Sequence, residues 1–509
     1  MNIINLLEYF ETTVNHNADK IAVRHNDTKI DFKELKNYSM KLGTYLSAMF
    51  KDSVNIPIAV FLPKEINIVI ADLGIMYSSN HFVNLDVKTP IERINNILKT
   101  VKPMVIVTSS AYVANLTGLS IPLVIIDEIE LHNVIIDDEV LLKKRSRLID
   151  TDPFCIINTS GSTGTPKGVV LNHRSFIDFM NASGELFNFD GSEIIGSLSP
   201  VVFDIFEFEL CMMMRNASEL ILLDAFLAAF PARLLECLVK NNVNFIFWVP
   251  SIMVNIANLG LLDKMELPNL RLVWFAGEVF PTKQFTMWYD KLPAAVFVNL
   301  YGPIEITLDC TYYIVKERPD ENEPLPIGIP YKNTDIMILN DNNNICHIGE
   351  EGELCVRGSS LAMGYYNNLE KTMSSFVQNP LNTMYPELIY RTGDIAYLRE
   401  DGNIIFKGRK DSLIKHMGYR IELGEIEHVV ENDLKLVDYC CAVYNSEKRE
   451  IVLFYENQDE LSVGDFRKNI GRRLPSYMIP TEYIKLDVLP RNTNGKIDRL
   501  LLKDKINNM

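Results

Sequence analysis

The chain has 509 residues, of which 47% are hydrophobic and 23% charged, and its formal net charge is −16. This composition is typical of a globular protein long enough to bury several cores. The acidic balance argues against general binding to nucleic acid or to anionic membranes, because both reward basic patches. The N-terminus lacks the basic and apolar pattern of a signal peptide, and no run of 18 apolar residues occurs. We therefore expect a cytoplasmic protein without a membrane span.

The first 400 residues alternate between short β-rich runs and amphipathic stretches. The runs that we interpret as buried strands are 104–109, 122–127, 154–158, 244–250, 270–277 and 295–302. Residues 281–292 begin with proline, which suits the first turn of a helix. This alternation predicts layered α/β subdomains with largely parallel sheets. Ligands of such sheets bind beyond the carboxyl ends of strands, and the glycine turns TSGSTG, FAGE and LYGP each follow a predicted strand.

The pattern changes after about residue 340. EGELCVRG (351–358) and IAYLREDGNIIFKG (395–408) are typical of hairpins with DG or NN turns, and they predict a β-rich portion. The last hundred residues are short, mixed and charged, which indicates a small α+β domain. We therefore predict an N-terminal core of residues 1–410 and a C-terminal domain of residues 411–509.

The stretch NTSGSTGTPKG (158–168) combines glycines, hydroxyl side chains and a lysine. It does not fit the P-loop template, because five residues separate Gly161 from Lys167 and Pro166 removes an N–H that would face phosphate. Successive amides and hydroxyls can still surround a polyphosphate. Taken alone, the stretch fits a phosphate-binding loop or a mobile surface loop.

The stretch is one of several motifs in a fixed order. The others are YGPIE (301–305), GELCVRG (352–358), YRTGD (390–394), GRKDSLIKHMGYRIELGEIE (408–427), LPSYMIP (474–480) and NGKIDR (494–499). Together they resemble the adenylate-forming (ANL) superfamily over nearly the whole chain. The chain most resembles the amino-acid adenylation domains of nonribosomal peptide synthetases, which serve natural product biosynthesis, and D-alanine–carrier protein ligases.

The resemblance implies an ATP-dependent ligase that works in two steps. A carboxylate first attacks the α-phosphorus of ATP, which gives an acyl-AMP and pyrophosphate. The phosphopantetheine thiol of a carrier protein then attacks the acyl-AMP. Both steps move negative charge between atoms, so that catalysis is expected to rest on positioning and electrostatics.

The resemblance also implies which residues hold the nucleotide. The β- and γ-phosphates would be held by Thr159, Ser160, Gly161, Ser162, Thr163 and Lys167. Glu305 matches the ligand of Mg²⁺, a hard ion suited to carboxylate and phosphate oxygens. The ribose hydroxyls would be bound by Asp394 with help from Arg409, while Tyr301 would stack beside adenine and Gly277 would allow a close approach of the base.

Lys496 corresponds to the lysine that bridges the substrate carboxylate and AMP during acyl-AMP formation. The alternative interpretation is that Lys496 is a surface lysine near the C-terminus without a catalytic role. Asp411 marks the hinge about which the family's small domain moves between the two steps. Lys415 and Gly418 would serve the arrangement for thiol transfer.

One position departs from the family pattern. Ile304 stands where the family usually has a threonine whose hydroxyl contacts the α-phosphate. The loss of one charge-assisted hydrogen bond would weaken catalysis by roughly 1.5–3 kcal/mol if nothing replaced it.

The substrate is expected to be a small amino acid. Asp204, after Phe203, matches the aspartate that pairs with the α-amino group, and a helix-cap aspartate is its alternative interpretation. By the same resemblance, the rest of the pocket is Ile205, Phe208, Phe247, Trp274, Ala276, Leu300, Leu308 and Asp309. Three large aromatic side chains leave a small cavity, and a buried acid needs a partner. A serine-like substrate is favoured, while glycine, alanine and a short diamino acid stay open, since shape alone discriminates poorly.

Ten residues follow Arg499, too few for a carrier domain, so that we expect a separate carrier protein as partner. Two other functions stay open. One is an acyl-CoA synthetase for a small carboxylic acid, against which Asp204 argues. The other is a non-catalytic interaction protein with this fold, for which Ile304 is the single supporting feature.

Overall fold

The computed structural model describes the chain apart from residues 1–2, 161–165, 411–412, 458–460, 492–496 and 508–509. The chain divides into two compact units. Unit 1 consists of Met1–Val87, Lys102–Ile157 and Val169–Lys410, and unit 2 of Lys88–Val101, Asn158–Gly168 and Asp411–Met509. Two short segments thus group with the C-terminal hundred residues, and the domain division that the sequence predicts stays a prediction.

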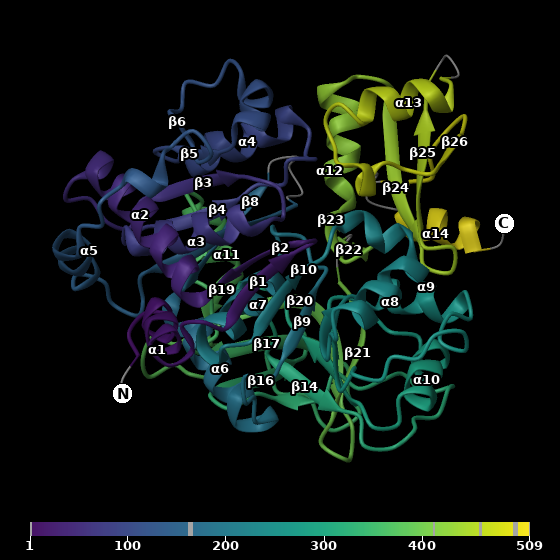
Figure 1. The fold of residues 1–509 in the computed structure, drawn as a ribbon. Coiled ribbons are helices and arrows are strands. Elements are labelled where there is room, and N and C mark those ends of the chain that lie inside the picture. The colour runs from purple at the N-terminus through teal and green to yellow at the C-terminus, as the bar shows by residue number, and fades with distance from the viewer. Residues whose placement is uncertain (1–2, 161–165, 411–412, 458–460, 492–496, 508–509) are drawn as a thin grey trace. The chain divides into compact units, whose positions relative to one another are not determined.

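Unit 1 contains a large, mostly parallel sheet (Figure 1). In spatial order its strands are β15 (Ile329–Pro330), β14 (Thr311–Ile314), β13 (Val296–Tyr301), β12 (Leu272–Phe275), β11 (Phe245–Trp248), β9 (Ile194–Ser197), β10 (Glu219–Leu222), β1 (Ile21–His25) and β2 (Thr28–Asp31). The neighbours from β13 to β1 pair in parallel, and the two edges pair antiparallel. β11 and β12 are buried along their whole length, as expected for strands covered on both faces.

A second sheet is also mostly parallel. Its strands in spatial order are β18 (Gly364–Tyr365), β8 (Lys167–Asn172), β7 (Pro153–Thr159), β4 (His81–Asn84), β3 (Pro57–Phe61), β5 (Ile106–Thr108) and β6 (Leu123–Ile125). The pairs from β7 to β6 are parallel, whereas β18 pairs antiparallel with β8. Each strand predicted before residue 310 lies in one of these two sheets, within a few residues of its expected bounds.

The helices of unit 1 connect and cover these strands. They are α1 (Leu7–Asn17), α2 (Phe32–Phe50), α3 (Ile66–Tyr77), α5 (Asp138–Arg145), α6 (His173–Phe187), α7 (Asp204–Asn216), α8 (Pro231–Lys240), α9 (Pro250–Asn258), α10 (Thr282–Lys291) and α11 (Leu369–Ser375). Local sequence explains several of their starts. Asp31 and Glu34 form a capping box at α2, and α8 and α9 each begin with proline. α10 matches the helix predicted over 281–292, with Pro281 as its N-cap.

The last part of unit 1 is the β-rich portion that the sequence predicts. It is an antiparallel sheet of β16 (Thr334–Leu339), β17 (Gly352–Gly358), β20 (Leu388–Leu398), β19 (Phe376–Gln378) and β21 (Ile404–Arg409). β20 and β21 form the expected hairpin, and Gly402 has a φ of 83° in its turn. That left-handed conformation favours glycine, which explains the DG sequence.

Unit 2 is a small α+β unit with its own core (Figure 1, green to yellow for residues after 412). Its elements are α4 (Ile91–Val101), β22 (Leu413–His416), β23 (Tyr419–Glu422), α12 (Leu423–His428), β24 (Tyr439–Asn445), β25 (Glu450–Glu456), α13 (Val463–Ile470), β26 (Glu482–Lys485) and α14 (Arg499–Asn507). The ring of Phe466 on α13 packs against Tyr455 on β25, with centroids 5.0 Å apart. Across the described residues of both units, no helix is both long and apolar enough to cross a membrane.

The chain turns sharply after β13, where Gly302 is packed against the backbone of the returning chain. A Cβ at this position would lie 2.2 Å from the Leu308 carbonyl oxygen and 2.5 Å from the Asp309 Cα. Thr307 and Leu308, with φ of 57° and 63°, adopt left-handed backbone that β-branched and bulky residues rarely take. Glycine at residue 302 therefore permits a return path that is already strained.

We predict that Gly302→Ala destabilises the protein by about 1–3 kcal/mol, because residues 308–309 must move away from the added methyl group. Chemical denaturation measures this change. Gly464→Ala in α13 is the control, since its added Cβ would meet only the Ser462 hydroxyl at 3.7 Å. Equal stability of Gly302→Ala and wild type would contradict the packing described above.

Two buried histidines are neutral in the fold. Burial lowers the pKa of His81 to about 3, with His173 lowering it further, and burial lowers the pKa of His173 to about 4. Neither ring nitrogen of His81 has a hydrogen-bond partner among the described residues, while His173 Nδ1 accepts from the Leu6 N–H at 3.3 Å. The unfolded chain binds protons on both rings near the ordinary pKa of about 6.5, whereas the folded chain does not. Stability is therefore lost as the pH falls below about 6.5.

We predict that His81→Leu flattens the decline of unfolding free energy between about pH 6.5 and pH 4, because one group that favours the unfolded chain in acid is removed. Urea denaturation at a series of pH values measures the slope. His16→Leu on α1 changes an exposed histidine and serves as the control. A wild-type slope in His81→Leu would contradict the prediction.

Candidate active site

In unit 1, the buried carboxylate of Asp394 is contacted by two residues from other motifs, Tyr301 and Arg409. Asp394 lies in β20, directly opposite Arg409 in β21. Its Oδ1 accepts a hydrogen bond from Arg409 Nη1 at 2.5 Å, and its Oδ2 accepts one from the Tyr301 hydroxyl at 2.5 Å. Burial, followed by the charge of Asp394, holds the pKa of Tyr301 well above its usual range, so that the hydroxyl stays protonated and donates. The structure thus brings together Tyr301, Asp394 and Arg409, three of the four residues that the sequence assigned to ribose and adenine.

The part of β20 that contains Asp394 is fixed by hydrogen bonds of the neighbouring residues. The Thr392 hydroxyl donates to the Leu354 carbonyl at 2.7 Å and accepts from the Asp394 N–H at 3.0 Å. The Gly393 N–H donates to Glu353 Oε1 at 3.2 Å. These contacts anchor this part of β20 to β17, so that the Asp394 carboxylate is held by its own backbone as well as by its partners.

Glu305 lies in a single helical turn, Ile304–Ile306, directly after the bend at Gly302. It is 1% exposed, and its Oε1 accepts a hydrogen bond from the Tyr365 hydroxyl at 2.8 Å. The Glu305 carbonyl accepts from the Ala362 N–H at 2.9 Å. A carboxylate held in this way suits a hard cation such as Mg²⁺, which takes oxygen ligands. Ile304 beside it is buried and apolar, and it has no hydroxyl to offer a phosphate.

Sequence reasoning missed Tyr365. It lies in β18, sixty residues beyond Glu305, and β18 pairs with β8. A tyrosine in a short strand carries no local signal of this contact, which only the pairing of the strands creates.

Asp204 is the first residue of α7, where the helix dipole stabilises a negative charge. Ile205 and Phe208 follow on the same helix and are buried. The α7 start lies directly after the turn at Pro200–Phe203, in which the Phe203 N–H donates to the Pro200 carbonyl. The helix thus presents an acid at its first residue and apolar side chains behind it.

The three large aromatic residues of the predicted pocket form one packed cluster. Phe247 and Trp274 are register partners on β11 and β12, with ring centroids 5.6 Å apart. Phe208 stacks on Trp274 at 5.1 Å and meets Phe247 edge-on at 5.6 Å. All three are fully buried, and most of the remaining set is buried as well: Ile205, Ala276, Leu300, Leu308 and Asp309. The structure therefore brings the three aromatic residues into contact, and Ile205, Ala276, Leu300 and Leu308 belong to the same apolar region, a large buried cluster of unit 1.

Two polar groups stand out in this apolar region. The indole N–H of Trp274 is buried without a hydrogen-bond partner in the described part of the chain. Asp309 is 4% exposed, and after burial its charge is the next cause that holds the pKa of Tyr331 above the usual range. The Tyr331 ring packs on Phe179 at 5.0 Å, and Phe179 packs on Phe208 at 5.8 Å. Tyr331 is a neighbour of the predicted pocket that no sequence motif indicated.

Gly277 follows β12 with a φ of 90°. A Cβ there would come no closer than 3.6 Å to its nearest neighbour, the Val249 side chain, so that the backbone conformation rather than crowding favours glycine. Its successor Glu278 accepts a hydrogen bond from the Ser251 N–H at 2.8 Å. These contacts hold the turn whose backbone was expected beside the base.

The described ends of the glycine-rich loop belong to unit 2. Thr159 ends β7 and Lys167 begins β8. The Ser160 hydroxyl donates to the Arg420 carbonyl at 2.7 Å and accepts from the Glu422 N–H at 3.0 Å. Lys167 Nζ lies 3.7 Å from Glu422 Oε1. Gly161, Ser162 and Thr163 lie outside the described residues.

Two other expected residues of unit 2 sit in a tight hairpin. Lys415 in β22 pairs with Arg420 in β23. The connecting residues Met417 and Gly418 have φ of 54° and 81°, as in a two-residue type I′ turn. Asp411 and Lys496 lie outside the described residues.

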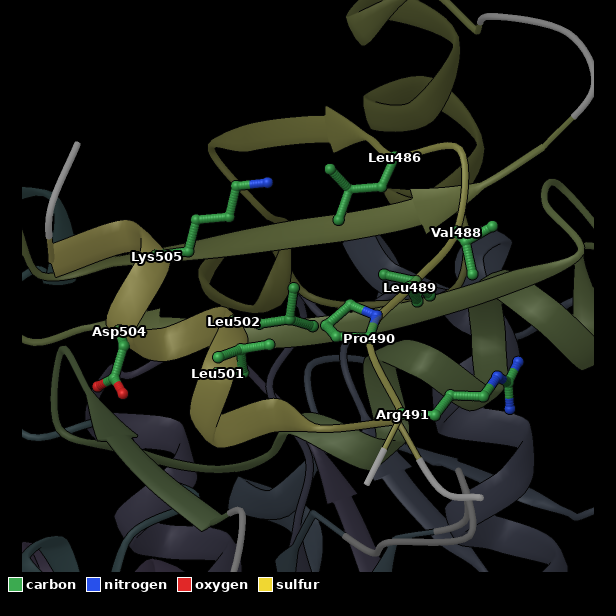
Figure 2. Close-up of a pocket in the computed structure, with 9 residues that line it drawn as sticks. All are labelled: Leu486, Val488, Leu489, Pro490, Arg491, Leu501, Leu502, Asp504 and Lys505. Atoms are coloured by element: carbon green, nitrogen blue, oxygen red, sulfur yellow. The ribbon is translucent and has the colours of Figure 1, made fainter. Parts of the chain in front are cut away.

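Unit 2 also contains a cavity of about 690 Å³ (Figure 2). It is lined by Leu486, Val488, Leu489, Pro490, Arg491, Leu501, Leu502, Asp504 and Lys505, from α14 and the chain after β26. Among the described residues, none that the sequence assigned to nucleotide, magnesium or substrate lines it.

Known proteins resemble this chain in sequence and in fold. Residues 10–366 match the model of a family described as AMP-binding enzyme. Surfactin synthase subunit 3 of Bacillus subtilis (strain 168) is 29% identical over 504 residues, a match that covers 98% of this chain and 38% of that relative. The chain thus spans well under half of the length of that relative.

Two solved structures share the fold. The Vibrio cholerae adenylation domain AlmE, in complex with glycyl-adenosine-5'-phosphate, has a TM-score of 0.86 at 20% identity, covering 100% of this chain and 99% of that one. PA1221, an NRPS protein containing adenylation and PCP domains, has a TM-score of 0.84 at 21% identity, covering 99% and 84%. Since the family model spans most of the chain, from α1 to β18, this protein belongs to the AMP-binding enzyme family, the adenylate-forming superfamily that its ordered motifs predict.

Proposed function

We propose that this protein activates a small amino acid with ATP to an aminoacyl-AMP and transfers it to the phosphopantetheine thiol of a carrier protein. The observation that carries this proposal is the end of β13. Leu300 lies in the apolar region with Trp274, while the next residue, Tyr301, donates to Asp394. Successive residues of a strand face opposite sides, so that one strand end serves both a substrate pocket and a nucleotide site.

In the first step, a substrate carboxylate oxygen bonds to the α-phosphorus of ATP. The bond between the α-phosphorus and the bridging oxygen breaks, and pyrophosphate leaves. Asp394 and Arg409 hold the ribose, Tyr301 lies beside adenine, and the loop that contains Ser160 and Lys167 binds the phosphates. Glu305 would hold Mg²⁺, which supplies charge neutralisation on the phosphates when bound. Lys496 places a cation between the substrate carboxylate and the α-phosphate, where negative charge gathers.

In the second step, the carrier thiol releases its proton to water and its sulfur bonds to the acyl carbon. The bond from that carbon to the AMP oxygen breaks, and AMP leaves. The hairpin that contains Lys415 and Gly418 serves this step in our proposal. The carrier partner is supported by the resemblance of the chain to PA1221, which contains adenylation and PCP domains.

Asp204 and Asp309 support an amino acid with a polar side chain as the substrate. An ammonium group would neutralise the acid at the start of α7, which a simple carboxylic acid would not do. Within the apolar region, the Trp274 N–H lacks an acceptor among the described residues, and the buried Asp309 carboxylate has several lone pairs with which to accept hydrogen bonds. A polar substrate side chain can accept from the first group and donate to the second. A serine hydroxyl can do both, whereas a short diamino acid supplies a donor alone, and glycine or alanine supplies neither.

The test of this function is amino-acid-dependent exchange of pyrophosphate into ATP. The panel holds the twenty common amino acids, D-alanine, β-alanine and 2,3-diaminopropionate, and we expect L-serine to give the highest rate. Thioester formation is then compared between coenzyme A and a phosphopantetheinylated carrier protein. The proposal would be contradicted if no amino acid of the panel supported exchange. It would also be contradicted if the protein formed a thioester only on coenzyme A and only from a simple carboxylic acid.

We predict that Lys496→Ala retains ATP binding but lowers the rate of aminoacyl-AMP formation by about 100-fold or more, since a cation at the reacting oxygens is lost. ATP binding is measured by calorimetry and adenylate formation by exchange. The control is Lys503→Ala, which removes an exposed lysine of α14. Normal exchange by Lys496→Ala would remove the catalytic role from this residue.

We predict that Asp204→Asn, which keeps the size and removes the charge, raises the KM for the amino acid by roughly 30-fold or more, as expected for the loss of one charge pair of about 2 kcal/mol at a half-buried acid. The KM for ATP should stay near the wild-type value. The rate with the desamino analogue of the substrate should not fall. An equal loss of activity with both substrates would argue that Asp204 has a structural role instead.

A further inference from the structure

Lys64 joins the two parallel sheets of unit 1 at one point. It follows β3 of the second sheet, and its Nζ donates to the carbonyls of Ser197 at 2.8 Å and Ser199 at 2.5 Å. Ser197 is the last residue of β9 in the large sheet, and Ser199 lies two residues beyond it. A single ammonium group thus fixes the backbone just where the chain leaves β9 toward Asp204.

The same lysine also faces the helix that Asp204 begins. Its Nζ lies 5.6 Å from the centre of the Phe206 ring on α7. Glu209, fully buried on the same helix, accepts a hydrogen bond from the Ser197 hydroxyl at 2.5 Å. The charge of Lys64 acts against the burial that raises the pKa of Glu209 to about 7. Lys64, Ser197 and Glu209 therefore form one charged network between β9 and α7.

Burial lowers the pKa of Lys64 to about 8, and Glu209 and Asp224 oppose this shift. The side chain therefore carries its proton at neutral pH, and its donors can satisfy two carbonyls together. Removing Lys64 leaves the Ser197 and Ser199 carbonyls without this donor and takes the nearby positive charge from the buried Glu209. The segment between β9 and α7, residues 199–204, is then held by fewer contacts.

We propose that Lys64 is the positioning residue for the amine-binding aspartate, since it fixes both the strand end before Asp204 and the helix after it. The lysine touches no substrate, and it acts by setting where the Asp204 carboxylate lies. Lys64 thereby determines the preference for α-amino acids over acids without an amino group. This inference rests on the proposed function, in which Asp204 binds the substrate ammonium.

The chain contains a matched control for this proposal. Lys20 Nζ also donates to two carbonyls, those of Gly191 and Ala217, each at 2.5 Å. Gly191 precedes β9 and Ala217 follows α7, so that Lys20 joins the same strand and helix at the ends that lie away from Asp204 in the sequence. A lysine that merely stabilises this strand and helix would behave like Lys20.

The experiment compares Lys64→Met, Lys64→Arg and Lys20→Met by pyrophosphate exchange with L-serine and with its desamino analogue, 3-hydroxypropionate. If the wild type prefers another amino acid of the panel, that amino acid and its desamino analogue are used. For Lys64→Met we expect the KM for the amino acid to rise about 10- to 100-fold, as for a misplaced binding group. The KM for ATP should change less than about twofold, and the preference for the amino acid should fall by the same factor as its KM rises.

Lys64→Arg keeps the charge and the donors, so that it should restore most of the preference for the amino acid. Lys20→Met should lower the Tm while both KM values and the preference stay at wild-type values. If Lys64→Met does not fold, as judged by circular dichroism, Lys64→Gln replaces it with the same expected result.

A wild-type preference in Lys64→Met, or equal effects of Lys64→Met and Lys20→Met on the KM for the amino acid, would overturn the positioning role while the proposed function stands. Absence of amino-acid-dependent exchange in the wild type would contradict the proposed function, and the inference with it. The two failures are therefore distinguished by the wild-type measurement alone.

Discussion

The site depends on the neutralisation of carboxylates that the fold has taken out of water. A buried carboxylate is destabilised unless donors or cations surround it. Asp394 meets this requirement with the Tyr301 hydroxyl and the Arg409 guanidinium, and Glu209 meets it with the Ser197 hydroxyl near the Lys64 ammonium. Each acid is thereby held in one orientation. In our proposal, Asp204 at the start of α7 binds the ammonium group of the substrate.

Parallel sheets supply the geometry for this charge arrangement. β9, β11, β12 and β13 run in the same direction, so that the residues that follow them gather at the carboxyl ends of these strands, along one edge of the large sheet. The segment before Asp204, the turn at Gly277 and the bend at Gly302 all leave this edge. The bend adds strain, since Thr307 has a left-handed backbone where the chain returns against Gly302. Strain of this kind persists only where surrounding contacts hold it, and here it precedes the predicted pocket residues Leu308 and Asp309.

Much of the fold and part of the site could be predicted from the sequence. Short runs of apolar residues predict the buried strands, and the DG turn predicts the hairpin of β20 and β21. Both signals can be recognised because they depend only on neighbours in the chain. The ordered motifs likewise predicted Tyr301, Asp394 and Arg409 as one group, and the structure brings them within hydrogen-bonding distance. Phe208, Phe247 and Trp274 were also predicted as one pocket, and they pack together.

What the sequence by itself determined is therefore the order of the elements, the family and the residues that motifs contain. The tertiary structure alone decided the partners of those residues. Lys64 reaches Ser197 across 133 positions, and Tyr365 reaches Glu305 across 60. A lone lysine after a strand or a tyrosine in a two-residue strand has no periodicity or spacing to reveal such a contact. Its partner is set by which strands become neighbours in the sheets, a property of the whole packed chain and of no local stretch.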